Sequence, residues 1–428
     1  MLEYNEHKKR LSLIEILFVI CIFFSFLSER TLFGRVSLLL FCSFAFITLL
    51  YNRGRMRFSA YFLLEAVFVF YCLMQNLTGY SYNVSESQKM LFTYLLCVIF
   101  YFSVFCVFSF SNDFDRILRI VFKVFYVAII VNFLCDIDKI FSGRFNSNDG
   151  ISILGMKIGG VIAITLGWIA GVCLFLNLYL YKVKSRNNKI YWFNFLFFTI
   201  TMFLSGTRKT LLLVLFVMIL QMFFESKNGN IFTLVKVISV VASISLVVLL
   251  LLFKVPILYD AIGNRIESMF LSVFEGDQVD SSMITRESLL ERAKDLFNRR
   301  PWTGWGLNGF MILTNLTLHC HNNFYELLVG VGLVGTALYY LKYVFLLAAL
   351  IKKYKRAQSS ATKKTCILFI FLIVLTTVLE IWQVCYFTRK FMLFHIIALS
   401  YAVLENEENA DENSIHSSEN AYKSVPNT

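Results

Sequence analysis

Apolar stretches of about 20 residues recur along almost the whole chain, and they restrict it to one class of fold. A hydrocarbon core about 30 Å thick is crossed by roughly 20 apolar residues in a helix. A hydrophobic share of 58% and only three prolines do not describe a water-soluble domain. Runs this continuous also exclude a membrane β-barrel, in which polar and apolar residues would alternate. We therefore predict an all-α integral membrane protein.

About twelve transmembrane helices are predicted from these windows. Their ranges are 12–28, 36–51, 59–76, 90–110, 117–135, 153–181, 190–204, 210–224, 232–253, 323–350, 365–382 and 386–403. The chain then divides into a bundle of about nine spans at 1–253, an extracytoplasmic loop at 254–321, about three further spans at 322–404 and a tail at 405–428. The tail is polar and acidic without apolar periodicity, and we expect it to be a disordered cytoplasmic end.

Basic residues in the short loops orient this bundle, because lysine and arginine are retained on the cytoplasmic side. With a cytoplasmic N-terminus, the inside segments carry the basic residues at 7–10, 52–57, 116, 119, 182–189, 352–356, 363 and 364. Both termini are then cytoplasmic and the loop at 254–321 lies outside the cytoplasmic membrane. The net charge of +12 follows mostly from this bias, so no nucleic-acid partner is expected.

The sequence lacks the motifs of several metal-binding and nucleotide-binding sites. The ten cysteines are scattered without zinc-ligand spacing and are interpreted as small core residues. The Asp113–Asp115 and Asp136–Asp138 patterns are short and favour solvated turns over a metal site. No phosphate-binding loop or dinucleotide fingerprint is present. We expect neither a metal nor another cofactor.

The long polar loop contains an amphipathic helix that ends at Pro301. The segment SLLE at 288–291 matches a capping box, and leucines, Ala293 and Phe297 follow at helical spacing. If the helix begins just before Arg286, this arginine shares the apolar stripe and needs either an anionic ligand or a neighbouring carboxylate, such as that of Asp280 or Glu287. Arg292 projects from another face and is a candidate substrate-binding residue.

Aromatic residues and glycines follow Pro301 in WTGWGLNGF, a composition suited to a tight turn with close backbone approach. His319 and His321 then stand directly before the next span. A histidine there can be an ordinary hydrogen-bonded interface residue or a catalytic group. His321 is followed by Asn322 and, about one helical turn later, by Glu326, which are placed to orient its imidazole or to bind a sugar hydroxyl.

A second basic element, SGTRKT at 205–210, forms a short external turn between two spans. Arg208 and Lys209 stand at a helix start, an end that favours anions. Either they reach lipid headgroups or they hold a phosphate, for which the planar fork of Arg208 is better suited. Arg144, on another external loop, is a weaker candidate of the same kind.

The SGTR turn, the arginine in the amphipathic helix, PWTGWGLNGF and HNNFYELLVGVGLVG together resemble the O-antigen ligase and Wzy-type polysaccharide polymerase superfamily. The resemblance implies a fold similar to that of metal-independent membrane glycosyltransferases of the GT-C type. It also implies catalytic roles for Arg208, Arg286 and His321 on a glycan linked to undecaprenyl diphosphate.

That resemblance implies glycosyl transfer outside the cytoplasmic membrane, where the leaving group must arrive already activated. Arg208 and Arg286 would stabilise the departing diphosphate, and His321 would act as general base or bind phosphate. The expected function is polymerisation of lipid-linked oligosaccharide repeats for capsule, exopolysaccharide or O-antigen. A flippase and a chain-length regulator are candidate partners within the bilayer. The alternatives are a ligase that uses another acceptor, and a flippase, which should instead show charged or broken helices near the midplane.

Overall fold

The structure is a computed structural model. It describes residues 12–27, 32–51, 59–111, 113–135, 151–153, 156–158, 163–184, 187–205, 208–225, 281–316 and 318–403, with a few single positions between 235 and 267. The predicted span at 232–253, the tail at 405–428 and Arg144 lie outside this part of the chain.

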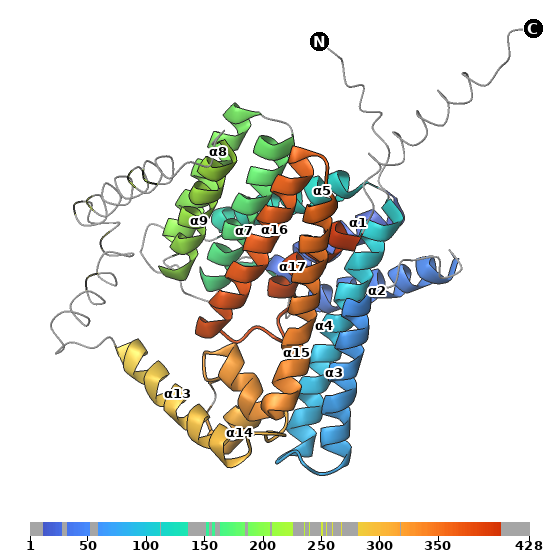
Figure 1. Cartoon of the computed structure of the whole chain (residues 1–428), viewed down its shortest axis with the longest axis vertical. Coiled ribbons are helices and arrows are strands. Elements are labelled where there is room, and N and C mark those ends of the chain that lie inside the picture. The colour runs from blue at the N-terminus through green and yellow to red at the C-terminus, as the bar shows by residue number, and fades with distance from the viewer. Residues whose placement is uncertain are drawn as a thin grey trace, which may run out of the picture.

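Helices dominate the described residues (Figure 1). The bundle contains α1 Leu13–Leu27, α2 Leu32–Tyr51, α3 Ala60–Leu77, α4 Val84–Ser111, α5 Phe114–Cys135, α7 Ala163–Leu178, the π-helix η1 Tyr179–Lys184, α8 Asn188–Leu204, α9 Arg208–Glu225, α15 Asn323–Arg356, α16 Ser360–Leu379, the 3₁₀-helix η3 Glu380–Trp382 and α17 Arg389–Val403. Seven of the described helical segments are long and apolar enough to cross a membrane, and three shorter apolar helices accompany them. The membrane class is thereby supported, while the count of about twelve spans stays a prediction.

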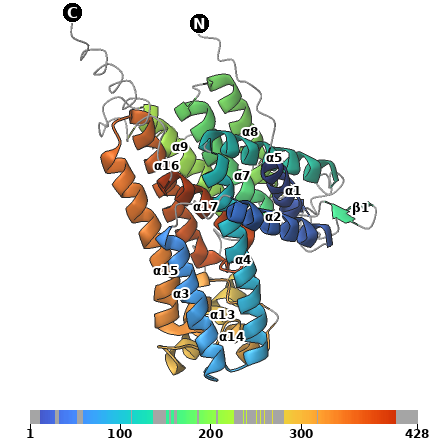
Figure 2. The ribbon, with the colours of Figure 1, turned by 90° about the vertical axis from the view of Figure 1, so that its right-hand side faces the viewer.

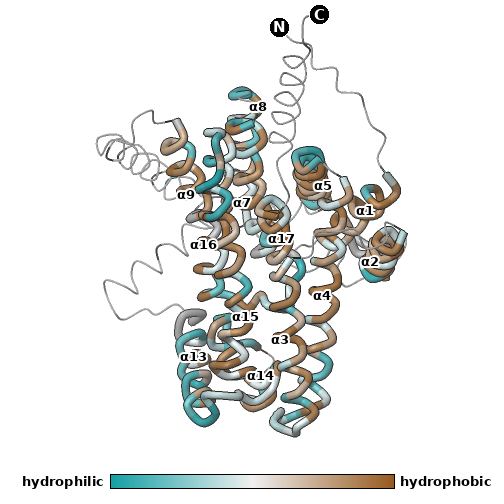
Figure 3. Tube along the Cα trace, turned by 45° about the vertical axis from the view of Figure 1, so that its right-hand side comes forward, coloured by the Kyte–Doolittle hydropathy of each residue, from teal (hydrophilic) through white to brown (hydrophobic). Residues whose placement is uncertain are grey.

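The bundle has an apolar outer surface and buries polar groups, the reverse of a water-soluble protein. Helix α3 shows this along its length, because Leu63 and Phe70 are 57% and 59% exposed while Glu65 and Gln75 are buried. Figure 3 shows the same apolar character along most of the bundle helices. Lipid is the solvent that such a surface fits, since polar side chains within a membrane turn toward the protein interior.

A short two-stranded hairpin interrupts the otherwise helical fold of the described residues. Strand β1, Ile151–Ile153, pairs antiparallel with β2, Met156–Ile158, and Figure 2 shows β1 at the edge of the bundle. The span predicted at 153–181 therefore begins only at Ala163. Isoleucine favours strands, and a hydropathy window does not separate a short apolar strand from the helix that follows it.

Helix α15 also differs from the single span predicted at 323–350, because it consists of two arms. Gly332 has φ 67° and ψ −171°, which is not helical. The ring of Phe324 stacks on that of Tyr340 with centroids 4.6 Å apart, whereas 16 residues of straight helix would separate them by about 24 Å. The first arm, 323–331, therefore folds back along the second arm, 333–356.

The glycine-rich turn after Pro301 holds this reversal. The backbone N–H of Gly306 donates to the carbonyl of Gly330 at 2.7 Å. A Cβ on Gly304 would come within 2.6 Å of the Gly330 backbone, and one on Gly332 within 2.3 Å of the Trp302 carbonyl oxygen. The close backbone approach predicted for these glycines is thus present, and its partner is the bend of α15.

Two further helices, α13 Ser281–Arg299 and α14 Gly309–Thr314, lie at the same end of the bundle as the α3–α4 turn (Figure 1). The backbone N–H of Tyr82 in that turn donates to the Trp305 carbonyl at 2.7 Å. Helix α13 ends before Pro301 as predicted, but it begins at Ser281, so the SLLE segment lies inside the helix and is not its cap. We call this side of the molecule the α13 end.

Candidate active site

The segment between α14 and α15 carries both histidines of the predicted site. Asn322 caps α15, with its Oδ1 accepting from the backbone N–H of Tyr325 at 3.1 Å. His321 has φ 57°, in the left-handed region. Non-glycine residues rarely adopt this conformation, and such strain is often found at functional sites. His321 and Asn322 therefore stand at the start of the first arm, and Glu326 lies in its first turn.

Glu326 contacts His319. Its Oε1 lies 2.9 Å from His319 Nδ1, and its Oε2 accepts from the backbone N–H of Cys320 at 3.1 Å. The side chain of Glu326 is 1% exposed and that of His319 is 24% exposed. The His319 ring also packs against Phe387, with centroids 5.2 Å apart. Spacing alone suggested that Glu326 would orient His321, because it could not show that the backbone of His321 is left-handed.

Asn323 joins this segment to the turn before α17, a role that the sequence analysis missed. It is fully buried. Its Oδ1 accepts from the backbone N–H groups of Cys385 and Tyr386 at 3.0 and 3.1 Å, and its Nδ2 donates to Glu380 at 2.8 Å. The start of the first arm is therefore fixed to a part of the chain some sixty positions away. The doubled asparagine of HNN was the only signal for this in the sequence.

Cys320 stands between the histidines and is buried. Burial, with the neighbouring Glu326 carboxylate, raises the pKa of its thiol well above the ordinary value. A thiol rather than a thiolate is a poor nucleophile. Cys320 therefore serves as a packing residue, in agreement with the interpretation of the cysteines as core residues.

Helix α13 presents Arg286 and Arg292 to the exterior, and both side chains are exposed. The prediction that Arg286 shares a buried stripe is wrong. Leu289 and Ala293 are buried in a small core with Phe310, Cys320 and Val329, whereas residues 285–288 are exposed. The start of α13 extends away from α14 (Figure 1). Arg286 has the helical phase of the apolar stripe but is exposed.

Arg208 is the first residue of α9. The other end of α9 meets the start of α16, where Lys364 Nζ donates to the carbonyl of Phe224 at 2.8 Å. Helix α15 runs from the α13 end toward the start of α16, so the start of α16 lies away from the α13 end. The last turn of α9 lies there too, and Arg208, at the opposite end of α9, therefore lies toward the α13 end. The structure thus puts Arg208 on the same side of the bundle as the histidines.

Glu65 of α3 and Lys342 of α15 form a buried ion pair that the sequence analysis did not identify. Lys342 Nζ lies 2.8 Å from Glu65 Oε1, both side chains are 1% exposed, and the ammonium stands 3.8 Å from the centroid of the Tyr339 ring. Tyr94 also donates to Glu65. This group links α15 to α3 and α4.

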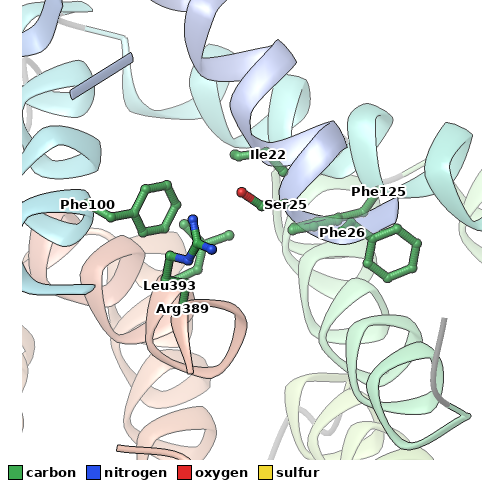
Figure 4. Close-up of a pocket in the computed structure, with 7 residues that line it drawn as sticks. All are labelled: Ile22, Ser25, Phe26, Phe100, Phe125, Arg389 and Leu393. Atoms are coloured by element: carbon green, nitrogen blue, oxygen red, sulfur yellow. The ribbon is translucent and has the colours of Figure 1, made fainter. Parts of the chain in front are cut away.

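A pocket lies between α1, α4, α5 and α17 (Figure 4). Figure 4 shows the guanidinium of Arg389 pointing into it. The lining residues are Ile22, Ser25, Phe26, Phe100, Phe125, Arg389 and Leu393, none of which belongs to the histidine segment. Among the described residues, no group of three histidine, cysteine, aspartate or glutamate side chains is arranged to hold a metal ion.

Comparison with known proteins bears on the same part of the chain. No curated protein matches the sequence. Residues 193–340 match the family model described as O-antigen ligase, a segment that runs from α8 through the histidines into the second arm of α15. Over this segment the chain is a match to the O-antigen ligase family, as its motifs predicted.

Proposed function

We propose that this protein is a membrane glycosyltransferase that polymerises oligosaccharide repeat units carried on undecaprenyl diphosphate, at the outer face of the cytoplasmic membrane. The observation that carries the proposal is the strained histidine segment, which lies within the residues that match the O-antigen ligase family. The same segment starts the first arm of α15 beside a buried carboxylate.

The reaction joins an acceptor hydroxyl to the anomeric carbon of the donor glycan. The bond from that carbon to the diphosphate oxygen breaks, its electron pair stays on the diphosphate, and a histidine takes the hydroxyl proton. Arg208 and Arg286 would stabilise the charge on the departing diphosphate. The exposure of Arg286 suits this role, since a lipid-linked substrate arrives from outside the bundle. Arg144 and Arg292 are further candidates for binding the donor or the acceptor glycan.

A ligase is the second candidate, because the matching family model carries that description. It would use the same donor and the same leaving group but would move the glycan to a different acceptor. The two activities differ in product: a polymerase makes a ladder of lengthening glycans, and a ligase makes one transfer to each acceptor.

The test uses the purified full-length protein in detergent with undecaprenyl-diphosphate-linked repeat units from its own host, and resolves the products on a gel. Wild type should give a ladder. Arg286→Ala and His321→Ala should lower the rate by roughly 10²-fold or more, the usual effect of removing a group that stabilises or activates the transition state. Arg299→Ala is the matched control, because Arg299 is exposed on the same helix at its other end.

Three outcomes separate the alternatives. Single additions to a second acceptor would support the ligase. Unchanged donor, with movement of the lipid-linked glycan across vesicle membranes, would show a flippase and overturn the proposal. A full ladder from Arg286→Ala would remove Arg286 from the site and leave the activity itself established.

A further inference from the structure

We propose that Glu380 is a positioning residue of the transfer reaction, an assignment that rests on the proposed function. Its carboxylate holds the first arm of α15, and with it the histidine segment, in place. Glu380 is the first residue of η3, directly after α16, and lies outside residues 193–340 that match the O-antigen ligase family. The candidate site therefore depends on a residue that the family match does not include.

Glu380 is enclosed and accepts hydrogen bonds from both arms of α15. It is 1% exposed. Its Oε2 accepts from Asn323 Nδ2 of the first arm at 2.8 Å and from Tyr340 Oη of the second arm at 2.7 Å. Tyr343, about one turn further along the second arm, donates from its hydroxyl to Oε1 at 3.3 Å. One carboxylate thus ties together two arms that the bend at Gly332 turns back on each other.

Asn323 transmits this restraint to the histidines. Both ends of its amide are used, because Oδ1 accepts from the backbone N–H groups of Cys385 and Tyr386 while Nδ2 donates to Glu380. A flipped amide would turn its donors toward those N–H groups and its oxygen toward the carboxylate, so only one orientation fits. His321 stands two positions before Asn323 in the chain. A shift of Asn323 therefore moves the histidine segment.

The turn that Asn323 binds touches the histidine segment a second time. Phe387 follows Tyr386 directly, and its ring packs against that of His319 with centroids 5.2 Å apart. Hydrogen bonds and a ring contact thus fix the segment to the turn before α17. The groups that a substrate meets are then already in place, which lowers the cost of aligning them for reaction.

The Glu380 carboxylate acts through its oxygens and not through an ion pair. Among the described residues, no lysine or arginine nitrogen is paired with it, and the buried Lys342 pairs instead with Glu65 at 2.8 Å. A buried carboxylate without a cation is stabilised by its hydrogen bond donors. An amide oxygen in the same place would also accept from Asn323 and Tyr340, whereas an apolar side chain would leave both donors without this acceptor.

Steady-state kinetics of repeat-unit addition, with rates expressed per mole of folded protein, tests the assignment. Glu380→Leu removes the acceptor and should lower kcat by about 10²-fold, the effect that a misplacement of about 1 Å can have. The KM for the donor should stay near that of wild type, because the enclosed Glu380 cannot contact a glycan. Glu380→Gln keeps an acceptor oxygen at almost constant volume and should retain most of kcat. A residue that only stabilised the fold would leave kcat unchanged in all variants.

Asn323→Ala should lower kcat as Glu380→Leu does. The double variant should lose no more than Asn323→Ala alone, because both changes remove the same hydrogen bond. Tyr343→Phe is the matched control, since it removes a donor from the same carboxylate but leaves the bond to Asn323 in place. It should keep the wild-type kcat. If Glu380→Leu does not fold in detergent, Asn323→Ala is compared with Glu380→Gln and Tyr343→Phe.

Hydrogen exchange followed by mass spectrometry gives a readout that is independent of activity. A peptide covering residues 318–327 should exchange faster in Glu380→Leu and Asn323→Ala than in wild type, because the first arm is no longer held. Glu380→Gln and Tyr343→Phe should exchange at the wild-type rate.

The outcomes are separable from those of the proposed function. Wild-type kcat and exchange in Glu380→Leu, or an equal loss of kcat in Tyr343→Phe, would overturn this assignment and leave the glycosyltransferase standing. A wild-type protein that extends no glycan would overturn both.

Discussion

At the scale of single residues, the largest energetic effect is expected at the buried pair of Lys342 and Glu65, whose charged atoms lie 2.8 Å apart. Lys342→Met should destabilise the protein by about 3–5 kcal/mol, because it leaves a buried carboxylate without its cation. The thermal unfolding midpoint in detergent measures this. Lys89→Met is the matched control, since Lys89 pairs with Glu86 at the surface with 69% of its side chain exposed. Such a pair contributes about 0–1 kcal/mol.

The double variant Lys342→Met with Glu65→Gln distinguishes the charge from the shape of the site. Removing both charges should recover most of the lost stability, because a neutral amide can still accept from Tyr94. If the double variant is no more stable than Lys342→Met, the loss arises from packing of the lysine stem against Tyr339 and not from the unpaired carboxylate.

At the scale of elements, the reversal of α15 at Gly332 determines where the histidines lie. Gly332→Ala should destabilise the protein and abolish transfer, since the new Cβ would stand 2.3 Å from the Trp302 carbonyl oxygen in a backbone conformation with φ 67°. Gly79→Ala is the control, because Gly79 has φ 73° but nothing within 4 Å of a Cβ. It should cost only about 1–2 kcal/mol of left-handed strain.

Thermal unfolding and repeat-unit addition are compared for these two glycine variants. Equal losses of stability and activity in the two variants would mean that left-handed backbone strain alone causes them. The contact between the turn after Pro301 and the bend of α15 would then contribute little. The expected larger loss at Gly332 would show that this contact holds the two arms together.

At the scale of the whole molecule, the orientation of the protein in the membrane follows from the basic turns. Several of these turns lie at the end of the bundle away from α13. Lys184 of η1 lies 3.2 Å from Asp115 near the start of α5. We expect this end to face the cytoplasm. Ser288→Cys on α13 should react with a membrane-impermeant maleimide on intact cells, after any outer layers are removed. Gln358→Cys, between α15 and α16, should react only after permeabilisation, since both positions are exposed.

The reverse labelling pattern would invert the topology and place the histidines on the cytoplasmic side, where the proposed lipid-linked donor would have to be used before export. The parent protein with its ten native cysteines is labelled first as the background. None of those with a described environment is more than half-exposed, so the background should be low.

The linear order of residues was sufficient for several features that depend on local chemistry. Apolar windows indicated the membrane class, because an unbroken apolar helix is the structure that satisfies backbone groups in lipid. Pro301 marked the end of α13, and the glycines after it marked a close backbone approach. The motifs around Arg208 and His321 also indicated the family that residues 193–340 match.

Packing settled the features that depend on residues distant in the chain. Lys342 meets Glu65 across 277 positions, and Asn323 meets Cys385 across 62. Hydropathy could not show the bend at Gly332, since apolar residues continue from the first arm of α15 into the second. Nor could spacing choose the histidine that meets Glu326, because a left-handed residue breaks the helical register that spacing assumes. Periodicity reports the environment of one helix, whereas a site is made where several helices and a turn come together.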